Sequence, residues 1–166
     1  MRYYDFYESP HGQMLLVARE EALSGVYFDA QKYHPRIDPE WRHDPRHAPL
    51  AQGRRELAEY FHDGRKHFDT AVAPEGTAFQ RLIWKAISTV DFGTTVTYGE
   101  LAQRAGVPGS ARAAGAATGR NPLTIIVPCH RIVGSSGALT GYAGGLARKR
   151  ALLALESGIP ELLSAA

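Results

Sequence analysis

The chain has a single cysteine among its 166 residues and no long hydrophobic run. One cysteine excludes an internal disulfide and any thiolate-rich zinc site, and it agrees with a reducing compartment. No apolar segment approaches the roughly 20 residues that span a bilayer. The N-terminal stretch MRYYDFYESP lacks the apolar core of a secretory signal. We therefore expect a cytoplasmic protein with no membrane partner.

Neither sign of charge dominates the chain, since the formal net charge is only +2. Its distribution is uneven: residues 1–73 carry 10 Lys+Arg against 12 Asp+Glu, whereas residues 74–166 carry 9 against 5. The positive excess lies in the half that holds the cysteine. This balance is compatible with a polyanionic partner and, equally, with scattered solvated charges.

The first half has the pattern of a small antiparallel sheet. The stretches RYYDFYE, QMLLVAR and LSGVYFD are short, rich in aromatic and apolar residues, and separated by the turn signals SPHG and EEA. Residues 30–49 are rich in proline and predict a surface loop. The histidines of this loop are not at metal-ligand spacing, so we expect them to be solvated; they are His34, His43 and His47.

A helix is predicted after this loop, over LAQGRRELAEYFHDG, because Leu50, Leu57 and Phe61 recur near helical spacing before Gly64. The next stretch, KHFDT, can add an edge strand. The composition shifts around VAPEGTA. We therefore divide the chain into an N-terminal α/β domain, residues 1–73, and a C-terminal domain, residues 74–166.

The second half is predicted to be mostly helical. TAFQRLIWKAISTV predicts a helix that begins at Thr77, since threonine is a preferred N-cap residue. One face of this helix is apolar: Phe79, Leu82, Ile83, Ala86, Ile87 and Val90. TYGELAQRAGVPGSARAAGAATGRNP predicts two further helices in close succession. Thr97 and Glu100 have the spacing of a capping box, Gly106 ends the first helix, and Ser110 can cap the second. This arrangement is typical of a helix-turn-helix.

The second of these helices, SARAAGAATG, has little with which to read bases in a major groove, because Arg112 is its one long side chain. A slim helix could instead approach a narrow groove closely and insert Arg112. The alternative is that the small residues only permit tight helix packing and that Arg112 lies on the surface.

Cys129 follows the apolar run LTIIV and Pro128, which predict an extended segment ending at the rim of the core. A thiol with an ordinary pKa is only about 3% ionised at pH 7, so a nucleophile needs a base or a positive field. His130 is adjacent, and Glu156, at the end of the predicted helix GLARKRALLALE, is a candidate to orient it. Taken alone, the Cys-His pair also fits an inert buried cysteine.

The stretch NPLTIIVPCHRIVGSSGALTGYAGGLARKRALLALE closely resembles the active-site region of the O6-alkylguanine-DNA alkyltransferases, with an Asn-Pro, a Pro-Cys-His-Arg core, a Tyr and a double Gly in the family's order. TTVTYGELAQRAGVPGSARAAGAA resembles the family's helix-turn-helix. The match covers roughly residues 77–156. It implies an α+β fold, in which an N-terminal ribonuclease H-like antiparallel sheet with a helix precedes a mostly helical domain with a winged helix-turn-helix. It also implies no cofactor, and no metal because the cysteines of a structural zinc site are missing.

The resemblance assigns catalytic roles by position. Cys129 corresponds to the alkyl acceptor, and His130 to the histidine that exchanges a proton with it through water. Glu156 corresponds to the carboxylate that orients this histidine. Asn121 corresponds to the asparagine that braces the turn before the active-site strand.

The resemblance also implies a set of substrate and DNA contacts. Tyr98 corresponds to the tyrosine that helps to rotate the nucleotide and donates to the base, and Arg112 to the finger that replaces the flipped base. Tyr142 corresponds to a wall of the pocket. At Ala143 some relatives have serine, which removes a hydroxyl contact and bears on substrate range. The same resemblance places four more residues at this surface: Ser110, Ala113, Ile132 and Lys149.

The implied activity is that of a single-turnover methylated-DNA–protein-cysteine S-methyltransferase. It would bind the minor groove of double-stranded DNA, flip O6-alkylguanine, and also act on O4-alkylthymine. We expect a monomer in solution; cooperative assembly along DNA stays open. Three alternatives are a non-catalytic alkylguanine-binding module, a Cys-His hydrolase that turns over repeatedly, and a regulator that senses methylation.

Overall fold

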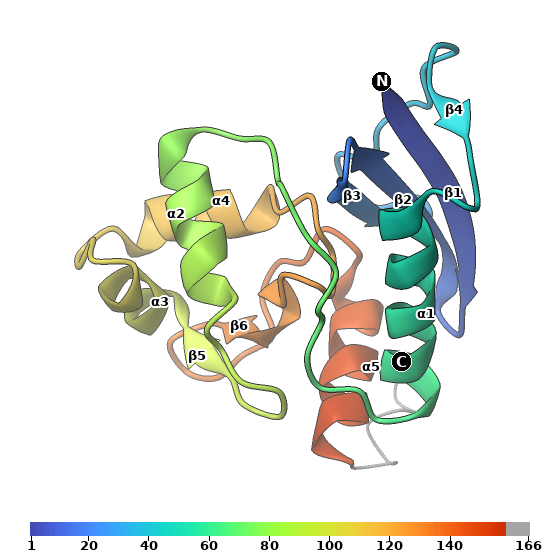
Figure 1. The fold of residues 1–166 in the computed structure, drawn as a ribbon. Coiled ribbons are helices and arrows are strands. Elements are labelled where there is room, and N and C mark those ends of the chain that lie inside the picture. The colour runs from blue at the N-terminus through green and yellow to red at the C-terminus, as the bar shows by residue number, and fades with distance from the viewer. Residues whose placement is uncertain (159–166) are drawn as a thin grey trace. The chain divides into compact units, whose positions relative to one another are not determined.

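A computed structural model describes residues 1–158 and divides the chain into two compact units. The first unit comprises residues 1–75 together with 122–124, and the second comprises the remainder. Residues 122–124, which the sequence places in the C-terminal domain, thus belong to the first unit. The α+β class is confirmed, because a sheet with one helix is followed by a mostly helical unit (Figure 1).

The sheet of the first unit begins with the expected antiparallel meander. Its strands are β1 (Arg2–Ser9), β2 (Gly12–Arg19) and β3 (Ala22–Phe28). A fourth strand, β4 (Arg42–His43), pairs in parallel with β1, so the order is β3-β2-β1-β4 and the sheet is mixed rather than purely antiparallel. The sequence could not reveal β4, since two polar residues in a proline-rich loop carry no alternation.

The structure agrees in part with the expectation that the loop histidines are solvated, because His43 is exposed and His34 and His47 are half-buried, but each ring also has a polar contact. The Nε2 atom of His43 lies 2.8 Å from Oδ1 of the buried Asp5. The Nε2 atom of His47 lies 2.6 Å from the carbonyl oxygen of Glu20, while Nδ1 of His34 contacts only the carbonyl of the next residue. Within residues 1–158 no group of three His, Cys, Asp or Glu side chains is arranged to hold a metal ion.

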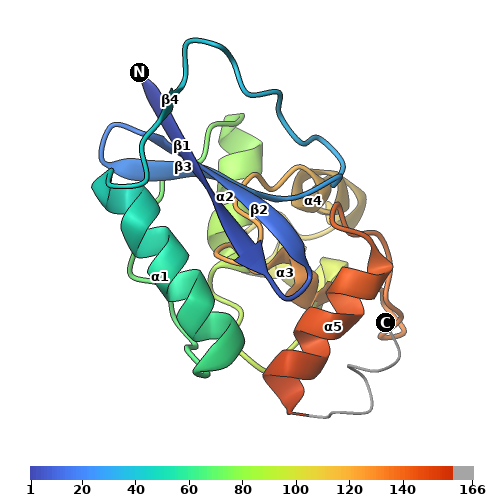
Figure 2. The same cartoon turned by 90° about the vertical axis from the view of Figure 1, so that its right-hand side faces the viewer.

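The predicted helix is α1 (Ala48–His62), and it ends before Gly64, whose φ is +72°. Its apolar side chains, Leu50, Leu57 and Phe61, are buried as expected. The helix lies along one face of the sheet (Figures 1 and 2). It approaches closely at Gly53, where a Cβ atom would lie 2.9 Å from Cδ1 of Leu23.

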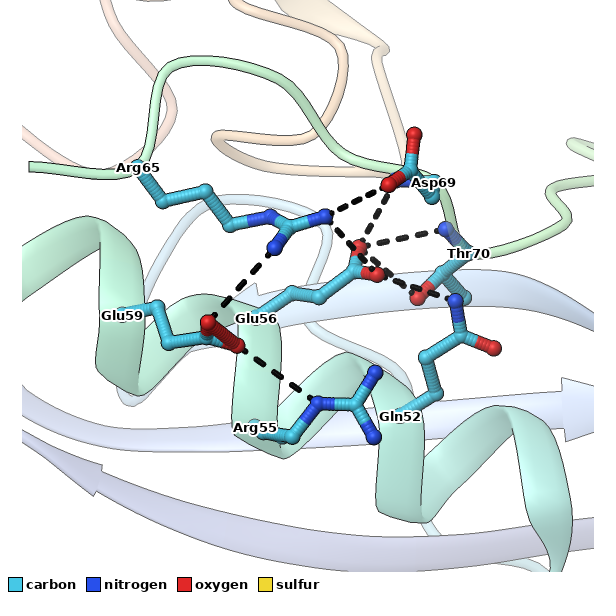
Figure 3. Close-up of polar contacts among 7 residues, drawn as sticks. All are labelled: Gln52, Arg55, Glu56, Glu59, Arg65, Asp69 and Thr70. Carbon is cyan, nitrogen blue, oxygen red and sulfur yellow. Dashed lines mark hydrogen bonds and ion pairs between the residues drawn. The ribbon is translucent and has the colours of Figure 1, made fainter.

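The stretch KHFDT forms no strand, contrary to the expectation; residues 69 and 70 are held by Glu56 of α1 instead. The fully buried Glu56 carboxylate accepts hydrogen bonds from the backbone N–H groups of Asp69 and Thr70, at 2.9 and 3.1 Å, and from the Thr70 hydroxyl. Gln52 donates to it at 2.9 Å, and Arg65 forms an ion pair at 3.2 Å (Figure 3). Only past this point does Val72 form a single bridge with Leu23 of β3.

Replacing Glu56 by glutamine is expected to lower the free energy of unfolding by about 3 kcal/mol, because it removes the charge on which five donor groups converge. Burial alone would raise the pKa of Glu56, but the hydrogen bonds from Gln52, Thr70 and Asp69 outweigh burial and lower the pKa. The carboxylate therefore stabilises the fold above its unfolded pKa of about 4.3, and this contribution is lost as the pH falls through the lower folded pKa.

Urea unfolding at pH 7 and at pH 4 measures the effect. Arg55→Ala is the matched control, since Arg55 is exposed on the same helix and its ion pair within residues 1–158 is with Glu59, at 3.5 Å. We expect it to change stability by less than about 0.5 kcal/mol. Equal losses in the two variants would contradict a special role for Glu56.

The second unit opens with α2 (Ala78–Ile87), and Thr77 caps it as predicted in a full capping box with Gln80. The predicted apolar face is only partly correct, because Leu82 is 41% exposed whereas Trp84 is buried. The Trp84 indole N–H donates to the carbonyl oxygen of Ala117 at 2.8 Å. The bond satisfies the one polar atom that Trp84 carries into the interior, so Trp84 rather than Leu82 packs inward.

Two helices follow as predicted, α3 (Tyr98–Arg104) and α4 (Ala111–Gly119), and α2 packs across them within this unit (Figure 1). The Thr97 hydroxyl accepts from the Glu100 N–H at 3.2 Å, as in a capping box. The Glu100 carboxylate accepts from that same hydroxyl instead of from the Thr97 N–H, so only half of the capping box forms. Ser110 occupies the N-cap position of α4, yet its hydroxyl caps no amide of the helix. The expected Ser110 cap is therefore wrong.

The rest of the second unit is short. β5 (Val96–Thr97) pairs in parallel with β6 (Ile132–Val133), which follows the 3-10 turn η1 (Cys129–Arg131). The last element, α5 (Leu146–Ser157), confirms the predicted C-terminal helix. None of the helices in residues 1–158 combines the length and the apolar character that crossing a membrane requires.

Candidate active site

Cys129 lies in a tight turn rather than at the end of the extended segment that the run LTIIV predicts. The backbone turns at Ile125, whose φ is +73°, and the Cys129 N–H donates to the carbonyl oxygen of Val127 at 2.8 Å. Asn121 holds the turn from the inside, because its Nδ2 atom donates to the Val127 carbonyl at 2.8 Å and to Cys129 Sγ at 3.2 Å. Turn geometry thus overrides the β-branched pattern, and Cys129 ends up 7% exposed.

His130 points into the protein and meets the C-terminal helix. Its Nε2 atom lies 2.6 Å from Oε2 of Glu156, and both residues are buried. The other ring nitrogen, Nδ1, is buried and has no hydrogen-bond partner among the residues that the structure describes. An ionised carboxylate only accepts hydrogen bonds, so the proton of a neutral His130 lies on Nε2 and the Nδ1 lone pair is free to take another.

The acid–base properties fit a proton acceptor. Burial lowers the pKa of His130 and outweighs the opposing effect of Glu156, so the imidazole is neutral at pH 7. Burial would raise the pKa of Glu156, but its bonds to His130 and Arg131 lower that pKa to about 2. The pair therefore rests as an anion beside a neutral imidazole.

The Cys129 thiol is itself protonated at rest. Burial raises its pKa, while the hydrogen bond from Asn121 and the positive charge of Lys149 act in the opposite direction. A positive field alone does not activate this thiol, so the sulfur needs a base at the moment of reaction.

Lys149 of α5 is fully buried and directs its ammonium group at the backbone. The Nζ atom donates to the carbonyl oxygens of Ile132, at 2.6 Å, and of Thr140, at 2.7 Å. Burial lowers its pKa to about 8, with the Cys129 charge opposing. Ile132 is fully buried as well. The structure thus gives these two residues the role of holding β6 and the loop over 134–145.

Tyr142 lies in that loop, followed by the half-buried Ala143. The Tyr142 hydroxyl is buried and has no hydrogen-bond partner among residues 1–158. Burial, followed by the charge of Cys129, raises its pKa well above 10, so the hydroxyl keeps its proton. A buried phenol without a partner beside a thiol is suited to bind a polar group of a ligand.

The predicted DNA-contact residues lie on the helical part of the second unit. Tyr98 at the start of α3 is half-buried, and its ring lies against α4, where a Cβ atom on Gly115 would be 3.5 Å away. Arg112 and Ala113 are exposed on the first turn of α4, and Ser110 precedes them. Hydrogen bonds join Asn121 to Cys129 and His130 to Glu156, and the backbone links the two pairs because Cys129 and His130 are adjacent.

Sequence reasoning missed Arg131. This buried residue donates from Nε to Oε1 of Glu156 at 2.8 Å and from Nη2 to Oε2 at 3.0 Å. Its position within the Pro-Cys-His-Arg core was the available signal.

Both halves of the chain match domains of one known protein family. Residues 2–74 match the family described as 6-O-methylguanine DNA methyltransferase, ribonuclease-like domain, and residues 78–158 match 6-O-methylguanine DNA methyltransferase, DNA binding domain. The methylated-DNA–protein-cysteine methyltransferase of Methanosarcina acetivorans is 44% identical over 154 residues, which cover 93% of this chain and 97% of that protein.

Solved structures agree. The crystal structure of Mycobacterium tuberculosis OGT in complex with DNA superposes with a TM-score of 0.88 at 39% identity, covering 98% of this chain and 99% of that one. The O6-methylguanine methyltransferase of the same organism gives a TM-score of 0.86 at 42% identity, covering 95% and 94%. Because these similarities extend over nearly the whole chain, it belongs to the 6-O-methylguanine DNA methyltransferase family and repairs O6-methylguanine directly, by transferring the methyl group to a protein cysteine.

Proposed function

We propose that Cys129 is the alkyl acceptor and that His130, Glu156 and Asn121 prepare it for the reaction. One observation carries this proposal: the chain's single thiol is fixed by Asn121 at 3.2 Å, in the same turn as a neutral histidine paired with a buried carboxylate. A histidine oriented by a carboxylate is a common means of activating a cysteine.

The proposed step forms one bond and breaks one. The Cys129 sulfur attacks the alkyl carbon on the guanine O6 atom, a C–S bond forms, and the C–O bond breaks with its electron pair staying on guanine. The thiol proton passes through a water molecule to Nδ1 of His130, and the departing guanine takes a proton from the Tyr98 hydroxyl. The proton held by His130 then returns to Tyr98 through solvent, so the sum is thiol plus alkylguanine giving thioether plus guanine. A thioether does not react with water under these conditions, so each molecule acts once.

The proposed substrate is double-stranded DNA that contains O6-alkylguanine, with O4-alkylthymine as a second lesion. The reactive carbon is inside the duplex, so the nucleotide has to leave the stack before the sulfur can reach it. The small residues of α4 allow close approach to the minor groove, and the exposed Arg112 fills the space of the flipped base. Tyr142 and the backbone around Ala143 would line the pocket. A cytoplasmic location and a monomeric state in solution belong to the same proposal.

Titration with a short duplex bearing one O6-methylguanine tests the proposal. We expect the intact mass of the protein to increase by one CH2 unit, since a methyl group replaces the thiol hydrogen, and transfer to stop at one equivalent per chain. Peptide mapping should place the added mass on Cys129.

Repeated turnover would instead indicate a hydrolytic enzyme. Binding of the duplex without any mass change would indicate a lesion-binding module. A methyl group on another residue would reject Cys129 as the acceptor while leaving the family's reaction intact.

A further inference from the structure

The buried arginine of the cysteine turn has no part in the mechanism above. Each of the three guanidinium nitrogens of Arg131 donates a hydrogen bond inside the second unit. Nε and Nη2 donate to the two oxygens of Glu156, and Nη1 donates to the carbonyl oxygen of Val90 at 2.7 Å. The guanidinium carbon also lies 5.7 Å from the centre of the Phe92 ring. Two parallel N–H donors on one carboxylate form the strongest and most directional kind of ion pair.

Glu156 is thereby shared among several donors. Its Oε2 atom accepts from both His130 and Arg131, whereas Oε1 accepts from Arg131 and, at 3.5 Å, from the Gly93 N–H. A carboxylate next to histidine alone would attract a proton onto the imidazole. With a fixed cation on its other side, part of the carboxylate charge is already neutralised, and the carboxylate itself cannot become a donor to Nε2.

We propose that Arg131 is a positioning residue for the alkyl transfer, which keeps Glu156 ionised and His130 neutral so that Nδ1 can accept the thiol proton. This inference rests on the proposed roles of Cys129 and His130. It assigns a function to a residue that touches neither substrate nor sulfur.

The charges around His130 fit this role. Glu156 and Lys149 act from α5, and Arg131 acts from η1; the carboxylate favours the protonated imidazole, and the two cations oppose it. The Cys129 thiol and the Tyr142 hydroxyl are both neutral at pH 7, because burial raises the pKa of each. Removing the Arg131 charge therefore raises the pKa of His130, and the imidazole begins to hold a proton near neutral pH.

The test is the pH dependence of single-turnover transfer from free O6-alkylguanine base, which avoids any effect on DNA binding. In Arg131→Gln, which keeps donors but loses the charge, we expect the acidic limb of the profile to move up by about one pH unit or more. In Arg131→Lys, which keeps the charge, the limb should stay within about half that distance of the wild type. Arg104→Met is the control, because it removes an exposed cation whose described contacts are with Thr89.

A limb that stays in place in Arg131→Gln, with only a lower plateau or melting temperature, would reduce Arg131 to a structural residue and overturn the proposal. Should that variant fail to fold, nitrogen NMR of His130 in the wild type decides: we expect a neutral ring at pH 7 with its proton on Nε2, and a charged ring would overturn it. Absence of transfer to Cys129 in the wild type is a different result, and would reject the proposed function itself.

Discussion

A Cys129→Ser variant is expected to transfer no measurable alkyl group to itself, at a rate at least about a thousandfold below that of the wild type. Serine keeps an atom that can accept the hydrogen bond from Asn121, so the turn has no reason to rearrange. A hydroxyl, however, is a far weaker nucleophile than a thiol, and the proposed relay through His130 suits the more acidic group. Single-turnover transfer from a duplex with O6-methylguanine, followed by intact mass, measures the loss.

Binding supplies the control for this variant. Its affinity for the lesion-bearing duplex should lie within about threefold of the wild type, since the sulfur provides no more than a small part of the contact surface. A variant that transfers at the normal rate would show that the acceptor is another residue. A variant that has lost binding as well would indicate a damaged fold, which the melting temperature would reveal.

An Arg112→Ala variant should lose about a hundredfold in the rate of transfer from duplex DNA while reacting almost normally with free O6-alkylguanine base. Removing the stacked nucleotide from the duplex costs a few kcal/mol, and the inserted side chain offsets that cost only when a duplex is present. Arg112 is exposed on the first turn of α4. Parallel single-turnover measurements on the two substrates give the ratio directly.

Arg104→Ala separates insertion from simple loss of charge. This exposed arginine ends α3 of the same unit, and its removal should weaken duplex binding only slightly and in a salt-dependent manner. Equal losses for Arg112→Ala on duplex and on free base would mean that Arg112 acts on the pocket rather than in the groove.

Local patterns predicted most elements of the fold. The aromatic and apolar stretches of β1 to β3, the apolar spacing of α1 and the Thr77 cap of α2 are properties of short segments, and each appears where expected. Elements that depend on distant partners were missed: β4 exists because β1 lies beside it, and the segment over residues 66–70 is held by Glu56 rather than by strand pairing.

The sequence likewise predicted some features of the candidate site and missed others. The sequence predicts Glu156 as a partner for His130, and the structure places the two 2.6 Å apart. The turn at Ile125 could not be foreseen, because β-branched residues favour extended backbone and the Asn121 side chain that overrides them acts from outside the run. Arg131 carries no periodic signal, and its ion pair with Glu156 joins positions 25 residues apart.

The interleaving of the two units along the chain has a consequence for biosynthesis. The Val26 N–H donates to the carbonyl oxygen of Pro122, and the Thr124 N–H donates to the carbonyl oxygen of Val26, so β3 obtains these partners from residues synthesised about a hundred positions later. While the ribosome is still making the helices in between, the first unit has an open strand edge, the kind of surface that invites wrong pairing. The nascent chain thus completes its N-terminal unit only when residues 122–124 emerge, so the edge of β3 stays open while α2, α3 and α4 are being made.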